Sequence, residues 1–145
     1  MTFEEVDEII CSYGFYRCSM DDSLHKSMYY MYPGIDRLAI YTEKLWKHNL
    51  NSLDKKHYST IELNEVDSVI FSPIVLWSTG VIGINYANDS LRLCRKNTHT
   101  TNTLKLTKVR LNKELKNFKS SLESLLQEQK IMKINRKLKK METDF

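Results

Sequence analysis

Residues 103–143 decide the fold, and they read TLKLTKVRLNKELKNFKSSLESLLQEQKIMKINRKLKKMET. This stretch contains no Gly or Pro and is rich in Leu, Lys, Glu and Asn, which is typical of one long helix or of two consecutive helices. Its first part carries apolar residues mostly three or four positions apart, as on one side of a helix. These residues are Leu104, Leu111, Leu115, Phe118, Leu122, Leu125 and Leu126. We expect this first stripe to cover a sheet formed by the rest of the chain.

A second apolar stripe follows Gln127–Gln129 on the same predicted helix. It consists of Ile131, Ile134, Leu138 and Met141. At about 100° per residue, this stripe lies roughly half a turn around the helix from the first. A straight helix would therefore turn its two halves in opposite directions, whereas a kink near Gln129 would fold the second half back. We predict that the second stripe binds another protein or a second copy of the chain, by coiled-coil or helix-in-groove packing.

Basic residues crowd the same part of the chain and favour an alternative. Residues 1–100 hold 10 Lys or Arg against 13 Asp or Glu, whereas residues 101–145 hold 12 against 5. Such an asymmetry raises the question of a polyanionic partner. A nucleic-acid-binding arm would use phosphate contacts rather than base reading, because most of these residues are Lys and not Arg. The residues of this alternative site are Lys130, Lys133, Arg136, Lys137, Lys139 and Lys140.

The N-terminal residues 2–14, TFEEVDEIICSYG, predict a helix with signals at both ends. Thr2 is the expected N-cap, and Glu5 three residues later completes a capping box. Gly14 is the expected stop, because glycine tolerates the left-handed conformation that ends many helices. One side of this helix should be core and the other acidic.

Residues 15–95 predict a small antiparallel sheet. Short runs rich in aromatic and β-branched residues, such as KSMYYMY and RLAIYT, are separated by turn signals, among which PGID at residues 33–36 favours a hairpin. On a strand, Tyr30 and Tyr32 would share one face, where we expect them to pack in the core. Leu45, Trp46, Leu50 and Leu53 are spaced for a short helix or an irregular crossover.

Composition limits the class of protein. A chain of 145 residues with 41% hydrophobic residues is large enough to bury one core without disulfides or metals. Three cysteines at unpaired spacings and an acidic N-terminal stretch predict a reduced, cytoplasmic protein. The longest apolar stretch, residues 70–86, is too short and too interrupted to span a membrane.

Motifs for catalysis and for bound cofactors are lacking. The cysteines and histidines stand singly, which argues against a zinc site, and the four glycines are not grouped as phosphate-binding or dinucleotide-binding loops require. His25 and His57 have no neighbouring nucleophile and acid in a recognisable arrangement. We therefore predict a non-enzymatic protein without metal, cofactor or small-molecule substrate.

Residues 4–32, EEVDEIICSYGFYRCSMDDSLHKSMYYMY, resemble the opening of the small mRNA-cleaving toxins of bacterial toxin and antitoxin pairs. The shared order is a helix ending in Gly and Phe, a strand, and Ser-x-His before the next strand. The resemblance implies a fold like a double-stranded-RNA-binding domain and a catalytic role for His25. The usual Gly before Ser and His is Asp22 here.

These observations together predict an α+β fold. Residues 1–102 would form a body in which a small antiparallel sheet packs against the N-terminal helix. Residues 103–145 would form a long, basic, amphipathic helix that either belongs to the same domain or projects from it. The predicted function is protein–protein interaction, as a regulator, inhibitor or assembly factor. Nucleic-acid binding and, behind it, a toxin-type RNase activity are the alternatives.

Overall fold

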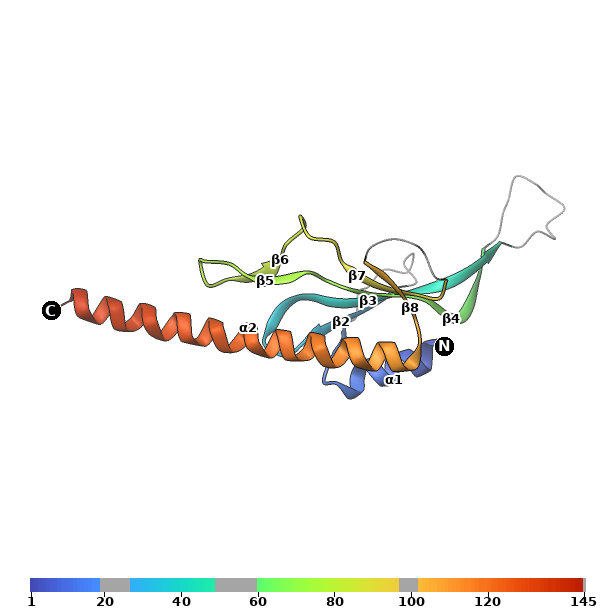
Figure 1. Ribbon diagram of the computed structural model, residues 1–145, viewed down its shortest axis with the longest axis horizontal. Helices are drawn as coiled ribbons and strands as arrows, with labels where there is room; N and C mark the ends of the chain where they lie inside the picture. The colour runs from blue at the N-terminus through green and yellow to red at the C-terminus, as the bar shows by residue number, and fades with distance from the viewer. Residues whose placement is uncertain (19–26, 49–59, 97–101, 145) are drawn as a thin grey trace.

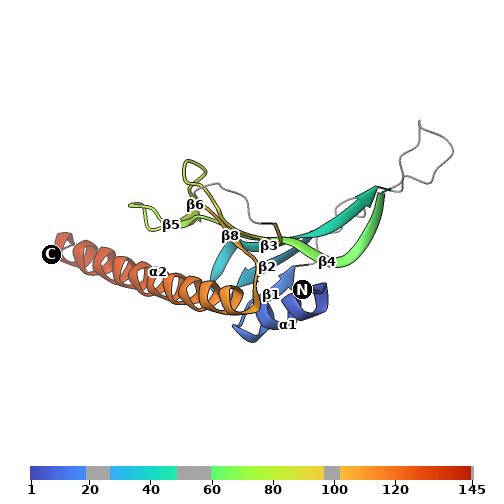
Figure 2. The same cartoon turned by 45° about the vertical axis from the view of Figure 1, so that its right-hand side comes forward.

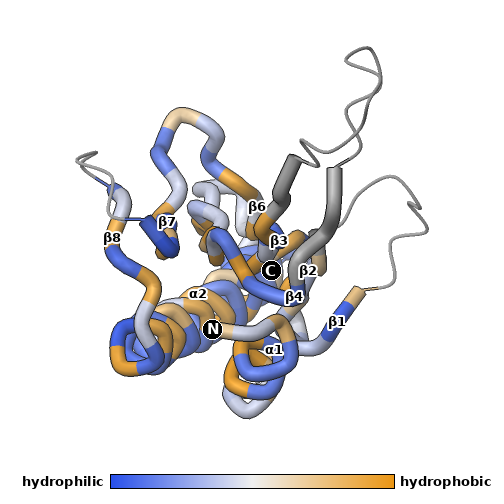
Figure 3. Tube along the Cα trace, turned by 90° about the vertical axis from the view of Figure 1, so that its right-hand side faces the viewer, coloured by the Kyte–Doolittle hydropathy of each residue, from blue (hydrophilic) through white to orange (hydrophobic). Residues whose placement is uncertain are grey.

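A computed structural model describes residues 1–18, 27–48, 60–96 and 102–144. It confirms the predicted α+β fold: an N-terminal helix α1 (Phe3–Ser12), a six-stranded sheet, a separate two-stranded hairpin and a long C-terminal helix α2 (Lys108–Thr143). Figures 1 and 3 show α1 and α2 side by side on one side of the sheet. The described residues therefore form two layers, with the core between helices and sheet.

The ends of α1 are those that the sequence predicts. The Thr2 hydroxyl accepts the N–H of Glu5, and the Glu5 carboxylate accepts the N–H of Thr2, both at 3.3 Å. After the helix, Gly14 adopts φ +92° and donates its N–H to the Cys11 carbonyl at 3.0 Å. Val6 and Ile10 are fully buried, so the side of α1 that carries them faces the core.

The six-stranded sheet has the order β1-β2-β3-β4-β7-β8. The predicted hairpin joins β2 to β3, with Gly34 at φ +88° in the turn. Tyr30 and Tyr32 are buried in the core, as expected. The strands are β1 (Tyr16–Cys18), β2 (Ser27–Tyr32), β3 (Ile35–His48), β4 (Thr60–Phe71), β7 (Leu91–Cys94) and β8 (Thr103–Lys105).

Two details differ from the sequence-based expectations. The sheet is not wholly antiparallel, because β8 pairs with β7 in the parallel direction, with Leu93 opposite Leu104. Leu45–His48 end strand β3 instead of beginning a helix, since they continue the pairing with β4; Leu50 and Leu53 lie outside the described residues.

The hairpin of β5 (Ile74–Leu76) and β6 (Ile82–Ile84) forms its own two-stranded sheet beyond β4. Its turn contains Gly80 at φ +87°, whose N–H donates to the Trp77 carbonyl at 2.8 Å. A Cβ on Gly83 would lie 2.8 Å from Nε1 of Trp77, so glycine is needed there for close approach. Figures 1 and 2 show this hairpin lying over the middle of α2.

Helix α2 starts later than predicted and has no kink. Thr103–Lys105 form β8, and Thr107 caps α2 by accepting the N–H of Arg110 at 3.1 Å. Leu104 therefore belongs to the sheet and not to the helical stripe, because apolar and polar residues alternate from Thr103 to Leu106 as on a strand. The helix then continues without a break through Gln129, over about 54 Å for its 36 residues.

Candidate interaction surface on the C-terminal helix

The first half of α2 is the part that covers the sheet. Leu111, Leu115 and Leu122 are buried, and the same side continues with Phe118 and Leu125, which pack against the core. The turn between β2 and β3 reaches this side at Leu126, since a Cβ on Gly34 would lie 3.2 Å from Leu126 Cδ2. The first stripe thus has the core role predicted for it, although Leu104 packs against the core from strand β8 and not from the helix.

The last part of α2, residues 130–143, is called the tail below. In Figures 1 and 2 it runs past the tip of the β5–β6 hairpin and ends farther out than any labelled strand. The four side chains of the second apolar stripe lie here and are all about half exposed. The exposed fractions are 48% for Ile131, 57% for Ile134, 54% for Leu138 and 58% for Met141.

The hairpin contacts only one side of this part of the helix. Gln129 Nε2 donates to the Gly80 carbonyl at 3.0 Å, and Arg136 Nη2 donates to the Ser78 carbonyl at 3.3 Å. Gln129, Met132 and Arg136 continue the spacing of four and three residues that begins at Leu111, so they lie on the sheet-facing side of α2. The second stripe is centred roughly 160° away from that side, and its four side chains are left about half exposed.

The six basic residues proposed for nucleic acid lie on the tail, but they do not form one uniform surface. All six are exposed, and no acidic residue interrupts them between Gln129 and Met141. Helix geometry at about 100° per residue places Lys133, Arg136 and Lys140 on the sheet-facing side. The same geometry places Lys130 and Lys137 on the border of the apolar stripe. Arg136 differs from the rest, since the hairpin already holds its guanidinium.

The sequence contained a signal for the hairpin contacts that the charge pattern obscured. Gln129 and Arg136 extend the core spacing of Leu115, Leu122 and Leu125, although neither is apolar. A polar side chain on the core-facing side of a helix needs a hydrogen-bond partner in the segment that packs there. The carbonyls of Gly80 and Ser78 in the hairpin turn are these partners.

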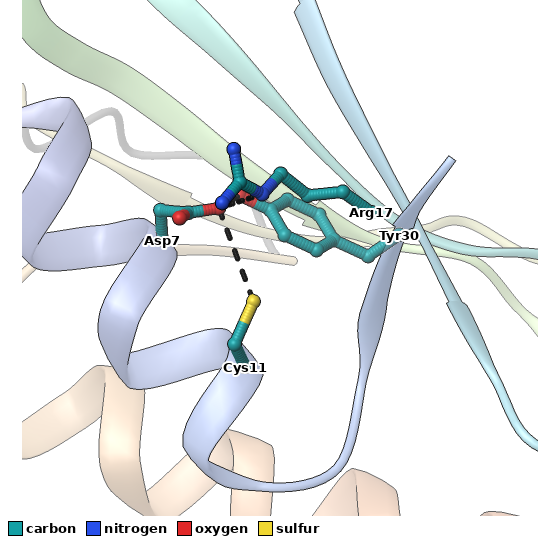
Figure 4. A network of polar contacts seen from close by, with 4 residues as sticks. All are labelled: Asp7, Cys11, Arg17 and Tyr30. Carbon is teal, nitrogen blue, oxygen red and sulfur yellow. Dashed lines mark hydrogen bonds and ion pairs between the residues drawn. The ribbon is translucent and has the colours of Figure 1, made fainter. Parts of the chain in front are cut away.

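A second polar cluster joins α1 to the sheet (Figure 4). Asp7 Oδ1 accepts the hydroxyl of Tyr30 at 2.6 Å and lies 3.3 Å from Nε of Arg17 and 4.0 Å from the thiol of Cys11. Burial, reinforced by the Asp7 carboxylate, raises the pKa of Tyr30 well above its ordinary value. The phenol therefore stays protonated and donates permanently, so the cluster fastens α1 to β1 and β2.

Thiol chemistry is not favoured at any of the three cysteines. Burial raises the pKa of Cys11, Cys18 and Cys94, and for Cys11 and Cys94 nearby Asp7 and Asp67 raise it further. A raised pKa leaves little thiolate, which is the nucleophilic and metal-binding form. The part of the chain that the structure describes holds no group of three or more His, Cys, Asp or Glu suited to a metal ion.

The residues of the toxin resemblance cannot be placed in the same way. His25 and Asp22 lie outside the described residues, and so does His57. The predicted catalytic role of His25 therefore stays a prediction. No helix in the described ranges is long and apolar enough to cross a membrane.

Comparisons with models of known protein families, with curated proteins and with solved structures found no match to this chain.

Proposed function

We propose that this protein acts by binding another protein through the tail of α2, with the stripe of Ile131, Ile134, Leu138 and Met141 as its contact surface. It would work without catalysis, as a regulator, inhibitor or assembly factor in the cytoplasm. The three free cysteines accord with a reducing compartment. The observation that carries the proposal is the pair of opposed stripes on one straight helix, of which the first is buried and the second is not.

The buried area limits the affinity that the apolar stripe alone can provide. Complete burial of an apolar side chain of this size contributes about 1.5–3 kcal/mol, so four that start half exposed offer on the order of 3–6 kcal/mol. Association itself costs roughly 4–15 kcal/mol in lost translational and rotational freedom. The stripe is therefore an anchor, and the basic residues beside it must add contacts with acidic groups on the partner for a stable complex.

Nucleic-acid binding is the second candidate, because five lysines of the tail are exposed and no acidic residue separates them. Their contribution would be contact with phosphates, which salt weakens strongly. The two candidates differ in what they require of the apolar stripe. Protein binding needs Ile134 and Leu138, whereas phosphate contact needs the lysines alone.

Affinity capture from nuclease-treated lysate tests the proposal with two variants and a control. Ile134→Ser/Leu138→Ser should lose a stoichiometric protein partner that the wild type retains. Val81→Ser/Tyr86→Ser is the matched control, because it also removes two exposed apolar side chains, but from outside the tail. Replacement of Lys130, Lys133, Lys137, Lys139 and Lys140 by Gln leaves the Arg136 contact with the hairpin intact. A loss of all captured material on nuclease treatment, with the Ser variant unaffected, would refute the proposal in favour of nucleic acid.

A further inference from the structure

The outer side of α1 carries a groove that suits the tail chemically. The groove has a volume of about 370 Å³ and lies between α1 and the first residue of α2. Met1 and Ile9 provide apolar surface, and Glu5 and Glu8 provide negative charge. Ser12 and Lys108 complete its lining.

Charge distinguishes this side of the molecule from the tail. Residues 1–14 contain four carboxylates, Glu4, Glu5, Asp7 and Glu8, and no Lys or Arg. Glu5 serves the capping box, Asp7 holds Tyr30, and Glu4 accepts a hydrogen bond from Asn64. Glu8 is exposed at the groove and has none of these roles. It is therefore free to meet a positive charge from outside.

The tail offers the complementary arrangement. Its apolar stripe is bordered by Lys130 and Lys137, which lie roughly 60–80° around the helix from the stripe centre. Two tails that met stripe to stripe would bring like charges together, which opposes their association. The lining of the groove holds two carboxylates, Glu5 and Glu8, against one lysine, Lys108, so it would instead attract the lysines at the border of the stripe.

The tail of a molecule cannot reach its own groove. Lys108 lines the groove, and Ile134 lies 26 residues farther along one unbroken helix, which corresponds to about 39 Å. Figure 1 shows α1 beside the first part of α2 and the C-terminus at the opposite end of the molecule. Contact between the two surfaces must therefore involve two molecules.

We infer that the tail of one copy docks in the α1 groove of a second copy, head to tail. The inference rests on the proposed use of the tail for protein binding and names its partner. Each copy then has one free tail and one free groove, so association continues until the assembly closes into a ring or extends as a filament. The lysines at the stripe border add attraction that falls as salt rises.

Two variants that each damage one surface provide the central test. Glu8→Lys/Ser12→Lys places positive charge in the groove and keeps the tail intact. Ile134→Ser/Leu138→Ser damages the tail and keeps the groove intact. In sedimentation equilibrium, the average mass of the wild type should rise beyond that of a dimer as the protein concentration increases. Each variant alone should have the mass of a monomer. A mixture of the two should form a dimer and stop there, because only one intact tail and one intact groove can meet.

Matched controls identify which charges act. Asp36→Lys/Asn88→Lys changes the net charge as much as the groove variant does, at exposed positions away from α1, and should associate like the wild type. On the tail, Lys130→Glu/Lys137→Glu should weaken association on the order of tenfold, because the attraction of these side chains toward the groove carboxylates becomes a repulsion. Lys133→Glu/Lys140→Glu makes the same charge change on the sheet-facing side of the helix, farther from the apolar stripe, and should have less effect.

The outcomes separate this inference from the proposed function. A monomeric wild type at every concentration, or a groove variant that still associates, would overturn the head-to-tail contact. An equal loss of association in the two lysine double variants would also overturn it, since this result would indicate a general effect of charge. If the Ser variant nevertheless loses a captured protein from lysate, the tail binds a different protein and the proposed function stands. Unchanged melting of the variants by circular dichroism verifies that each one folds.

Discussion

Two leucines on α2 permit a matched test of the opposed stripes. Leu122 and Leu138 are the same residue type on the same helix, and they are 1% and 54% exposed. The change to Ala removes the same three carbons at both positions and slightly favours the helix in both. Any difference in the free energy of unfolding therefore reports what surrounds each side chain.

The expected costs follow from that difference in burial. Leu122→Ala should lower the free energy of unfolding by about 2–5 kcal/mol, because it removes buried methyl groups and leaves a cavity between α2 and the sheet. Leu138→Ala should change it by no more than about 0.5 kcal/mol, since water already reaches the side chain and no cavity forms.

Urea denaturation followed by circular dichroism measures both values. For a slope of about 1–3 kcal/mol per molar urea, a loss of about 3 kcal/mol shifts the midpoint by roughly 1–3 M. The protein should be dilute enough to be monomeric, because association through the stripe would add stability that Leu138→Ala removes. Equal costs for the two variants under these conditions would refute the reasoning, since they would show that the tail packs on its own molecule.

Two further predictions concern the sheet side of the molecule. Tyr32 donates to Glu123 at 2.7 Å, and burial together with that carboxylate raises the pKa of Tyr32 from about 10 to about 12. Because the folded-state pKa of Tyr32 is raised, the contribution of this hydrogen bond to stability is complete below pH 10 and is lost as the pH rises through 12. The difference in the free energy of unfolding between the wild type and Tyr32→Phe, measured by urea denaturation, should therefore shrink across this range. A constant difference would contradict the assignment. Gly34→Ala should lower the free energy of unfolding by about 1–2 kcal/mol, because alanine is strained at φ +88° and its Cβ would press on Leu126. An unchanged melting curve for this variant would show that the turn adapts.

Local signals determined much of the architecture from the sequence. The capping box of Thr2 and Glu5, the stop at Gly14 and the Pro33–Gly34 turn depend on backbone sterics and on hydrogen bonds between near neighbours. These interactions need no distant partner, so a reading of the chain finds them. The half-turn offset between the stripes of α2 is equally local, because it follows from helical periodicity alone.

Only the tertiary structure decided which distant surfaces meet. The parallel pairing of β8 with β7, the hydrogen bond of Arg136 to the Ser78 carbonyl and the groove between α1 and Lys108 each join residues far apart in the chain. An arginine at position 136 would look the same in the sequence whether it lay on a solvated basic face or bound a hairpin turn. Its role depends on where the chain brings that turn, and this position is set by packing of the whole molecule, which no local pattern of residues encodes.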